Sequence, residues 1–259
     1  RPYCFYTRLM APVITAITDR VHFVQTDLVN WTMVAGGDEN GDGVVLIDAG
    51  FPGNRDDVLA SLGRLGFGVP DLRAILLTHA HIDHFGSAIW FAKVHGIPVY
   101  CHTAEVGHSK REYLEQASPL DIAARAWRPK FLTWSLAIMR KGALTHEGIP
   151  TTEALTEDVA AGLPGAPRVI ATPGHTSGHC SYLVDGVLVS GDALVTGHPL
   201  ARRPGPQLLP SLFNHDEAGC RRSLGVLGEV DAEVMLPGHG PVWRGPISAA
   251  VSQATTAEP

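Results

Sequence analysis

Residues 78–84, Thr78-His79-Ala80-His81-Ile82-Asp83-His84, place three histidines and an aspartate within seven positions. The apolar run 73–77 before them predicts a strand, and residues 86–95 after them predict a helix. An extended turn between the two would aim several imidazole nitrogens and a carboxylate into one small volume. These donors, without thiolates, suit zinc and also iron or manganese. The stretch therefore predicts a metal site at the carboxyl end of a strand, where open α/β sheets place ligands.

Three more polar clusters follow short apolar strands in the second half of the chain. Predicted strands at 168–171, 181–184, 187–190 and 233–236 alternate with turns, and a helix is expected at 217–227. The clusters that follow these strands are Pro173-Gly174-His175, Gly191-Asp192 and Pro237-Gly238-His239-Gly240.

The first half has the same order of elements. Residues 21–35 are rich in β-branched and aromatic side chains, and residues 40–43 predict a turn. A strand is predicted at 44–47, before a helix at 54–65. Two halves of similar order predict an α/β fold, an αββα sandwich of two mixed β-sheets flanked by helices. A chain of 259 residues with 45% hydrophobic composition is compatible with one domain over residues 1–259.

The segment 103–162 carries little strand signal and is expected to be a helical insertion. A helix is predicted at 120–144, with an interruption near Pro129. Four interpretations stay open: a helix pair that packs on the domain's own side, a lid over the site, an apolar pocket for an acyl group, or a face through which the chain forms a homodimer. The aromatic and large apolar side chains of this helix are Trp127, Phe131, Trp134, Leu136 and Met139.

Charge and hydropathy exclude several classes of partner. The net charge of −6 and the absence of a long lysine or arginine run argue against nucleic acid, and leave a small molecule as the expected partner. No apolar run approaches the ~20 residues that span a bilayer, so no membrane is expected. Residues 9–18 are followed at once by Asp19 and Arg20 and lack a cleavage pattern, which favours a cytoplasmic protein. Met10 is a candidate native start.

The four cysteines are widely spaced and form no CxxC pair. This spacing argues against a thiolate metal site or a disulfide scaffold, and predicts reduced, mostly buried thiols. They are Cys4, Cys101, Cys180 and Cys220.

These motifs resemble the metallo-β-lactamase superfamily, whose signature HxHxDH stands here at residues 79–84. Leu46-Ile47-Asp48-Ala49-Gly50 looks like the family's upstream motif, residues 173–179 like its third, Ser190-Gly191-Asp192 like its fourth and residues 236–240 like its fifth. Five motifs in the expected order are more specific than any one of them.

The resemblance implies a site for two zinc ions, with iron or manganese as alternatives. His79, His81 and His175 would hold the first metal, and Asp83, His84 and His239 the second. Asp192 would bridge the two. The family gives no ligand role to two further residues: Asp48 is assigned to orient a ligand histidine, and His179 to a structural role.

The chemistry implied is hydrolysis. Two cations about 3.5 to 4 Å apart lower the pKa of a bridging water toward ~7, so a bridging hydroxide can attack a polarised carbonyl. Asp83 is the candidate catalytic residue for proton transfer to the leaving group.

The substrate is expected to be an ester, a lactone or a thioester. A bridging Asp192 with ligand His84 resembles lactonases and glyoxalase II-type enzymes more than true β-lactamases. However, the chain differs from both kinds of relative. Val195 stands where related lactonases carry a tyrosine. After His239, in the region with which glyoxalase II-type enzymes bind glutathione, Arg244 is the one basic residue. The alternatives are β-lactam hydrolysis and a persulfide dioxygenase with a single iron.

Overall fold

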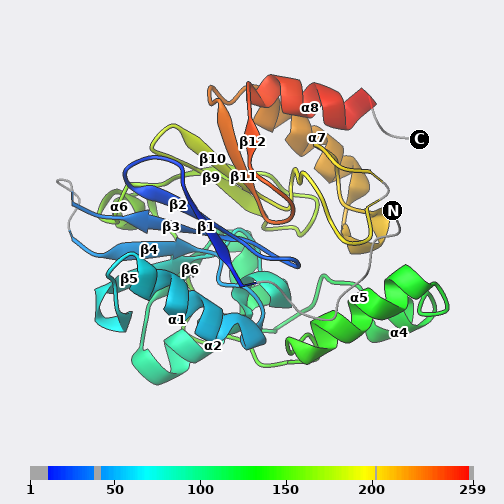
Figure 1. Ribbon diagram of the computed structural model, residues 1–259, viewed down its shortest axis with the longest axis horizontal. Helices are drawn as coiled ribbons and strands as arrows, with labels where there is room; N and C mark the ends of the chain where they lie inside the picture. The colour runs from blue at the N-terminus through cyan, green and yellow to red at the C-terminus, as the bar shows by residue number, and fades with distance from the viewer. Residues whose placement is uncertain (1–10, 38–41, 202, 257–259) are drawn as a thin grey trace.

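Two β-sheets lie face to face in the computed structural model, which describes residues 11–37, 42–201 and 203–256. Helices cover the outer face of each sheet (Figure 1). Both sheets contain parallel and antiparallel pairs, so the αββα sandwich of two mixed sheets is confirmed.

The larger sheet has seven strands that lie in chain order. Its first four strands pair antiparallel, and the pairs from β4 to β7 are parallel. The strands are β1 (Val13–Ala16), β2 (Val21–Gln25), β3 (Trp31–Ala35), β4 (Val44–Ile47), β5 (Leu72–Leu76), β6 (Val99–Cys101) and β7 (Glu153–Ala154).

The smaller sheet has five strands in the order β12-β11-β10-β9-β8. Among the described strands of this sheet only β10 and β11 pair in parallel, which brings the carboxyl ends of these two strands to the same edge. The strands are β8 (Arg168–Ala171), β9 (Cys180–Val184), β10 (Val187–Gly191), β11 (Val234–Pro237) and β12 (Trp243–Arg244).

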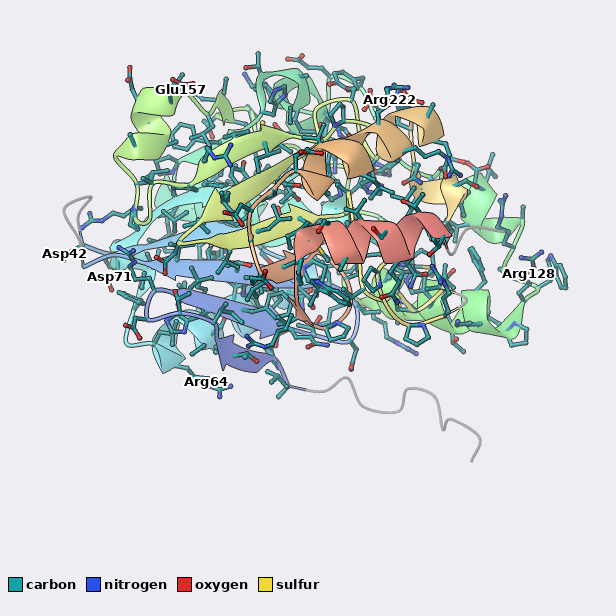
Figure 2. All side chains as sticks on the ribbon, turned by 90° about the horizontal axis from the view of Figure 1, so that it is seen from above. Asp42, Arg64, Asp71, Arg128, Glu157 and Arg222 are labelled. Carbon is teal, nitrogen blue, oxygen red and sulfur yellow. The ribbon has the colours of Figure 1, made fainter. Side chains whose placement is uncertain are left out.

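The helices divide between the two outer faces and one projection. α1 (Arg55–Arg64) and α2 (Ile82–His95) pack on the larger sheet, whereas α7 (Glu217–Gly228) and α8 (Ile247–Thr256) pack on the smaller one. α4 (Pro119–Ala123) and α5 (Pro129–Arg140) project at one end, where Arg128 lies, opposite to Asp42 and Asp71 (Figures 1 and 2). The short helices are α3 (Val106–Ser109), α6 (Glu157–Ala161), and the 3-10 turns η1 (Pro52–Asn54), η2 (Val69–Asp71), η3 (Thr103–Glu105) and η4 (Ser211–Phe213).

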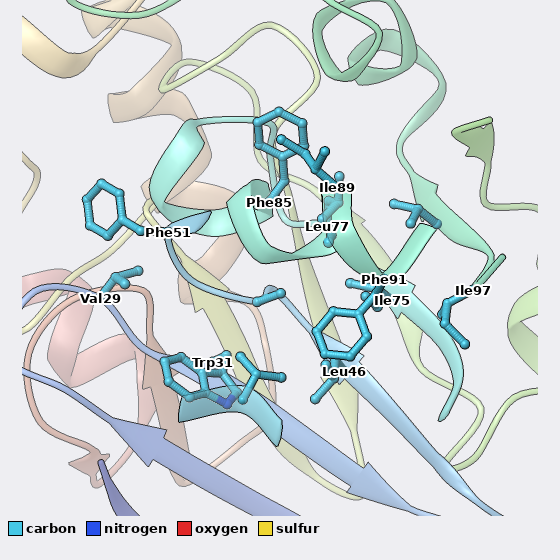
Figure 3. Close-up of a cluster of buried hydrophobic side chains, with 14 of the residues drawn as sticks. Val29, Trp31, Leu46, Phe51, Ile75, Leu77, Phe85, Ile89, Phe91 and Ile97 are labelled. Carbon is cyan, nitrogen blue, oxygen red and sulfur yellow. The ribbon is translucent and has the colours of Figure 1, made fainter. Parts of the chain in front are cut away.

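Three apolar layers hold this arrangement together. Strand β4 shows why: its side chains alternate, so Leu46 packs under α1 and α2 while Ile47 faces the other sheet. Figure 3 shows the first layer, with Leu46 and Phe91 between the sheet and α2. Full burial of such side chains contributes about 1.5 to 3 kcal/mol each.

The first turn of α2 corrects one expectation. The helix was expected from residue 86, with an extended turn before it, but it begins at Ile82, so Asp83 and His84 are helical. His81 has the extended conformation of a residue that precedes a helix, and its carbonyl accepts bonds from the N–H groups of His84 and Phe85. An acidic residue at Asp83 is favoured there by the helix dipole.

The helix expected at 120–144 is interrupted, as predicted, at Pro129. Arg128 is extended, with φ −84° and ψ 122°, because a residue before proline is disfavoured in the helical region. The structure therefore has two helices, α4 and α5, and Pro129 begins the second.

Short edge elements were missed by pattern analysis. β1, β7, β12, α6 and α8 had no expected counterpart, because elements of two to five residues and the small-residue helix α8 carry weak periodicity. Among the described residues no helix is long and apolar enough to cross a bilayer. Cys101, Cys180 and Cys220 are free and buried, as predicted, whereas Cys4 and the candidate start Met10 lie outside the described residues.

Candidate metal centre

All the proposed ligands lie beyond the carboxyl ends of strands, at one edge of the sandwich. Because parallel strands end at the same edge, loops far apart in sequence meet there. His79 and His81 follow β5, and Asp83 and His84 occupy the first turn of α2. The others come from the second half: His175 follows β8, Asp192 follows β10 and His239 follows β11.

The side chains form three overlapping groups, each with ligand atoms within 4.8 Å of one another. The structure thus brings together all seven residues that the motifs singled out. The groups are His79, His81 and His175; His79, His84 and Asp192; and Asp83, His84 and His239.

Asp192 lies at the centre of this cluster. Its Oδ2 is 3.2 Å from Nε2 of His239, 3.4 Å from Nε2 of His175 and 3.5 Å from Nε2 of His84. Nε2 of His79 is 4.0 Å away. One carboxylate oxygen therefore faces four ring nitrogens from three different motifs.

Several of these buried atoms have no protein partner. His79 Nε2, His84 Nε2 and Asp192 Oδ1 are inaccessible and make no hydrogen bond to the described residues. A buried polar atom without a partner costs about 1 to 3 kcal/mol, so such a cluster needs a ligand. Imidazole nitrogens and carboxylate oxygens are donors that suit zinc, iron and manganese, so the residues fit divalent metal ions.

Asp48 holds two of the histidines in a defined orientation. Its Oδ2 accepts a hydrogen bond from Nδ1 of His84 at 2.8 Å and from the Thr78 hydroxyl at 2.7 Å. Because the Thr78 hydroxyl donates to Asp48, its oxygen accepts from Nδ1 of His79, 3.0 Å away. In both rings Nδ1 is engaged in this way and Nε2 faces Asp192, which agrees with the orienting role expected for Asp48.

The other rings are held by acceptors that the sequence did not reveal. Nδ1 of His175 lies 3.0 Å from Oδ1 of Asn214, and Nδ1 of His239 lies 2.6 Å from the Leu28 carbonyl. His81 is reversed, because its Nε2 lies 2.6 Å from the Glu115 carbonyl and its Nδ1 lies 2.9 Å from Nε2 of His175.

Burial keeps three histidines of the cluster neutral. It lowers the pKa of His79 and His81 well below the usual value, and it also lowers the pKa of His175. Neutral imidazole is the form that binds a metal.

Charge acts in the opposite direction near Asp192. Burial lowers the pKa of His84 and His239, but the charge of Asp192, together with neighbouring carboxylates, outweighs it and raises both. Burial in turn raises the pKa of Asp192, and the two histidines outweigh that effect, so its pKa is well below normal. Asp192 is therefore a carboxylate, and a cation at these residues would displace protons.

His179 lies beside the cluster without taking part in it. Its Nε2 accepts a hydrogen bond from the Asp192 N–H at 3.0 Å, so its Nδ1 donates to the Thr172 hydroxyl at 2.9 Å. Both ring nitrogens are used, which agrees with the structural role expected for it.

Glu105 is a buried residue that sequence analysis missed. It accepts hydrogen bonds from the Ala80 N–H and His108 through Oε1, and from the Thr176 hydroxyl through Oε2. It thereby ties the loop with His79 and His81 to the loop with His175. A lone glutamate in a predicted helical segment gave no signal for this role.

A cavity of about 340 Å³ opens beside Asp83, Asp192 and His239. Its wall opposite the metal centre is formed largely by α4 and α5, and no described lysine or arginine lines it. The apolar side chains there include Ile122, Leu132, Trp134, Leu136 and Met139.

Not every aromatic side chain of this segment contributes to the wall. Trp127 is 76% exposed and does not line the cavity, and Phe131 does not line it either. Val195 is buried, where its backbone pairs with Gln207, and Arg244 is exposed in β12. Neither Val195 nor Arg244 reaches the cavity.

His198 lines the cavity and was not singled out by any motif. Its ring centroid is 5.0 Å from that of His239. Burial, followed by the charge of His239, lowers the pKa of His198 well below the usual value. A histidine six positions after Asp192 carries no recognisable spacing signal.

Comparison with known proteins places this arrangement in context. The family described as the metallo-beta-lactamase superfamily matches residues 24–239. The probable metallo-hydrolase YflN of Bacillus subtilis (strain 168) is 32% identical over 209 residues, which cover 76% of this chain and 75% of that protein.

Two further similarities are more limited. A hydroxyacylglutathione hydrolase of Alkalilimnicola ehrlichii is 31% identical over 146 residues, which cover 56% of this chain and 41% of that protein. The structure of the Rm3 metallo-beta-lactamase superposes with a TM-score of 0.63 at 19% identity, covering 95% of this chain and 91% of that one, which is a likeness of fold.

Proposed function

Because this chain belongs to the metallo-β-lactamase superfamily and is a metallo-hydrolase, we propose that it cleaves an ester, lactone or thioester at a dinuclear zinc site. The single observation that carries the proposal is the position of Asp192 Oδ2 within 4.0 Å of four ring nitrogens. A carboxylate in that position is suited to bridge two cations.

The ligand assignment divides the cluster in two. His79, His81 and His175 would hold one ion, and Asp83, His84 and His239 the other, with Asp192 shared. Zinc ions, or iron or manganese in their place, would supply Lewis-acid hydrolytic chemistry near neutral pH when bound at these residues. The oriented rings support this assignment, since each directs one ring nitrogen to the centre.

Asp83 is proposed to transfer the proton to the leaving group. Its side chain is 23% exposed and lines the cavity, unlike the almost fully buried Asp192. Asp83 Oδ2 lies 3.5 Å from Nε2 of His239, so it is next to the centre and open to substrate at the same time. A proton carrier needs both properties.

The cavity supports an apolar acyl group on the substrate. Leu132, Leu136 and Met139 of α5 line it, and a small molecule would gain most of its affinity by burying apolar surface there. The relative named hydroxyacylglutathione hydrolase favours a thioester as the bond cleaved. Because no described lysine or arginine lines the cavity, a neutral acyl thioester is a better fit than an anionic one.

A substrate panel with metal analysis tests the proposal. Protein purified without chelator should contain close to two divalent ions per chain, and should hydrolyse an activated ester, a lactone or a thioester faster than any β-lactam. An alkoxide or thiolate is a better leaving group than an amide nitrogen, which depends more strongly on protonation. A higher kcat/KM for a β-lactam than for every other substrate would contradict the bond type, and a single iron per chain would support a persulfide dioxygenase instead.

The homodimer expected through the helical insertion stays a prediction. Leu120 and Trp127 are 80% and 76% exposed, so the projection presents apolar surface. Sedimentation of the wild-type protein and of Trp127→Asp should show weaker self-association in the variant. If both proteins sediment with the mass of a monomer, the prediction of a homodimer interface is wrong.

A further inference from the structure

The His198 side chain has a defined tautomer. The N–H of Leu200 donates to its Nδ1 at 3.0 Å. A ring nitrogen that accepts a hydrogen bond carries no proton, so the proton of the neutral ring is on Nε2. No described residue accepts a hydrogen bond from that Nε2–H, and the side chain lines the cavity.

The ring is confined by aromatic neighbours. Its centroid lies 5.4 Å from the ring of Phe213 and 5.8 Å from the ring of Trp134. The loop that carries it is tied down on both sides, since the Thr196 N–H donates to the His239 carbonyl at 3.2 Å and Lys130 donates to the Ala201 carbonyl at 2.9 Å. A side chain held in this way presents its N–H in a fixed place.

Other donors are scarce at the metal end of the cavity. His81, His175 and His239 line it too, but each spends its N–H on the protein, on the Glu115 carbonyl, the Asn214 side chain or the Leu28 carbonyl. Asp83 and Asp192 are hydrogen-bond acceptors when ionised. A substrate carbonyl that develops negative charge would therefore meet the N–H of His198.

We infer that His198 donates a hydrogen bond from Nε2–H to the carbonyl oxygen of the bound substrate and stabilises the negative charge that develops on it. The inference rests on the proposed function, because it concerns the same hydrolytic step. A donor aimed at such an oxygen is worth about 10²-fold to 10³-fold in kcat when it acts alone. Metal ions share the task here, so about 10-fold to 10²-fold is expected for His198.

Two variants separate the N–H from the shape of the ring. His198→Phe keeps an aromatic side chain between Trp134 and Phe213 without a donor, and His198→Gln restores an N–H donor. We expect His198→Phe to lower kcat by about 10-fold to 10²-fold with KM within about twofold, and His198→Gln to recover part of the loss. The effect should be equal for esters with good and poor leaving groups, because the carbonyl oxygen is common to both.

Metal analysis and the cobalt-substituted absorption spectrum provide a readout independent of turnover. Both should be the same in the wild type and in His198→Phe, since the donor contacts substrate. An unchanged kcat, a loss of metal or an altered cobalt spectrum would overturn the inference, as would a loss that grows with the pKa of the leaving group. If the wild-type protein cleaves none of the esters, lactones or thioesters, the proposed function itself is wrong. If the wild type cleaves them and His198→Phe does so equally well, only the inference about His198 is wrong.

Discussion

Asp48 Oδ2 and His84 Nδ1 are joined by a 2.8 Å hydrogen bond across thirty-six positions of sequence. The same carboxylate accepts from the Thr78 N–H through Oδ1 and from the Thr78 hydroxyl through Oδ2. Asp48 has a φ of 62°, a left-handed conformation that aspartate and asparagine tolerate better than most residues. This residue thus connects β4 to the strand that precedes the histidine cluster.

The Asp48→Asn variant should bind metal about 10-fold to 10²-fold more weakly. Asparagine keeps the backbone conformation, but its amide NH₂ replaces one acceptor and would face an N–H or O–H donor. Chelator competition with zinc measures the affinity. Thr78→Val is the matched variant, because it removes the hydroxyl that links Asp48 to His79 and leaves the bond from His84 to Asp48. Equal zinc affinity in the wild type and in both variants would contradict the orienting role of Asp48.

The Asp192→Ala variant should lose metal and at least about 10²-fold of activity, because a shared ligand is removed. Elemental analysis and kcat on an activated ester measure the two effects. Asp231→Ala, at an exposed position, is the control and should match the wild type. Full metal content and an unchanged rate in Asp192→Ala would refute the bridging assignment.

The Leu136→Ala variant should raise KM more for long-chain than for short-chain acyl esters. Leu136 lines the cavity, and each methylene that loses its apolar contact costs about 0.8 kcal/mol of binding. A series of p-nitrophenyl esters of increasing chain length measures the trend. Trp127→Ala, on the same segment but outside the cavity, should leave the series unchanged, and a KM increase independent of chain length would argue against an acyl subsite.

The stability of the metal-stripped protein should depend on pH through His179. Burial, then the charge of His175, lowers the pKa of His179 to about 3. Between this value and the unfolded pKa of about 6.5, the unfolded chain binds a proton that the folded chain does not. His179 therefore lowers the free energy of unfolding by about 1.4 kcal/mol for each pH unit of acidification within that window.

Urea unfolding at several pH values in that window compares the wild type with His179→Gln. The raised pKa values of His84 and His239 act in the opposite direction in both proteins, so the difference between the two curves isolates His179. The free energy of unfolding should change less steeply with pH in His179→Gln than in the wild type, by about 1.4 kcal/mol per pH unit. If the free energy of unfolding depends on pH equally in both proteins, the pKa of His179 is not lowered by folding.

Local patterns in the sequence were sufficient for most of the framework. The alternation in β4 predicts a strand, and a polar cluster after a strand predicts a loop at the sheet edge, because both depend on neighbouring residues. The start of α2 was misplaced, since the pattern from residue 86 is helical but the N–H bonds to the His81 carbonyl that begin the helix earlier are not visible in it.

The sequence by itself determined the donor types, their order along the chain and the sandwich that carries them, because short motifs and periodicity are properties of adjacent residues. Only the tertiary structure decided how the donors are oriented, since His239 is held by the Leu28 carbonyl 211 positions away and His81 contacts His175 across 94 positions. It also decided which side chains line the cavity, because His198 enters and Trp127 does not. Contacts of this kind arise when two sheets pack, and no local pattern encodes the packing of one loop against another.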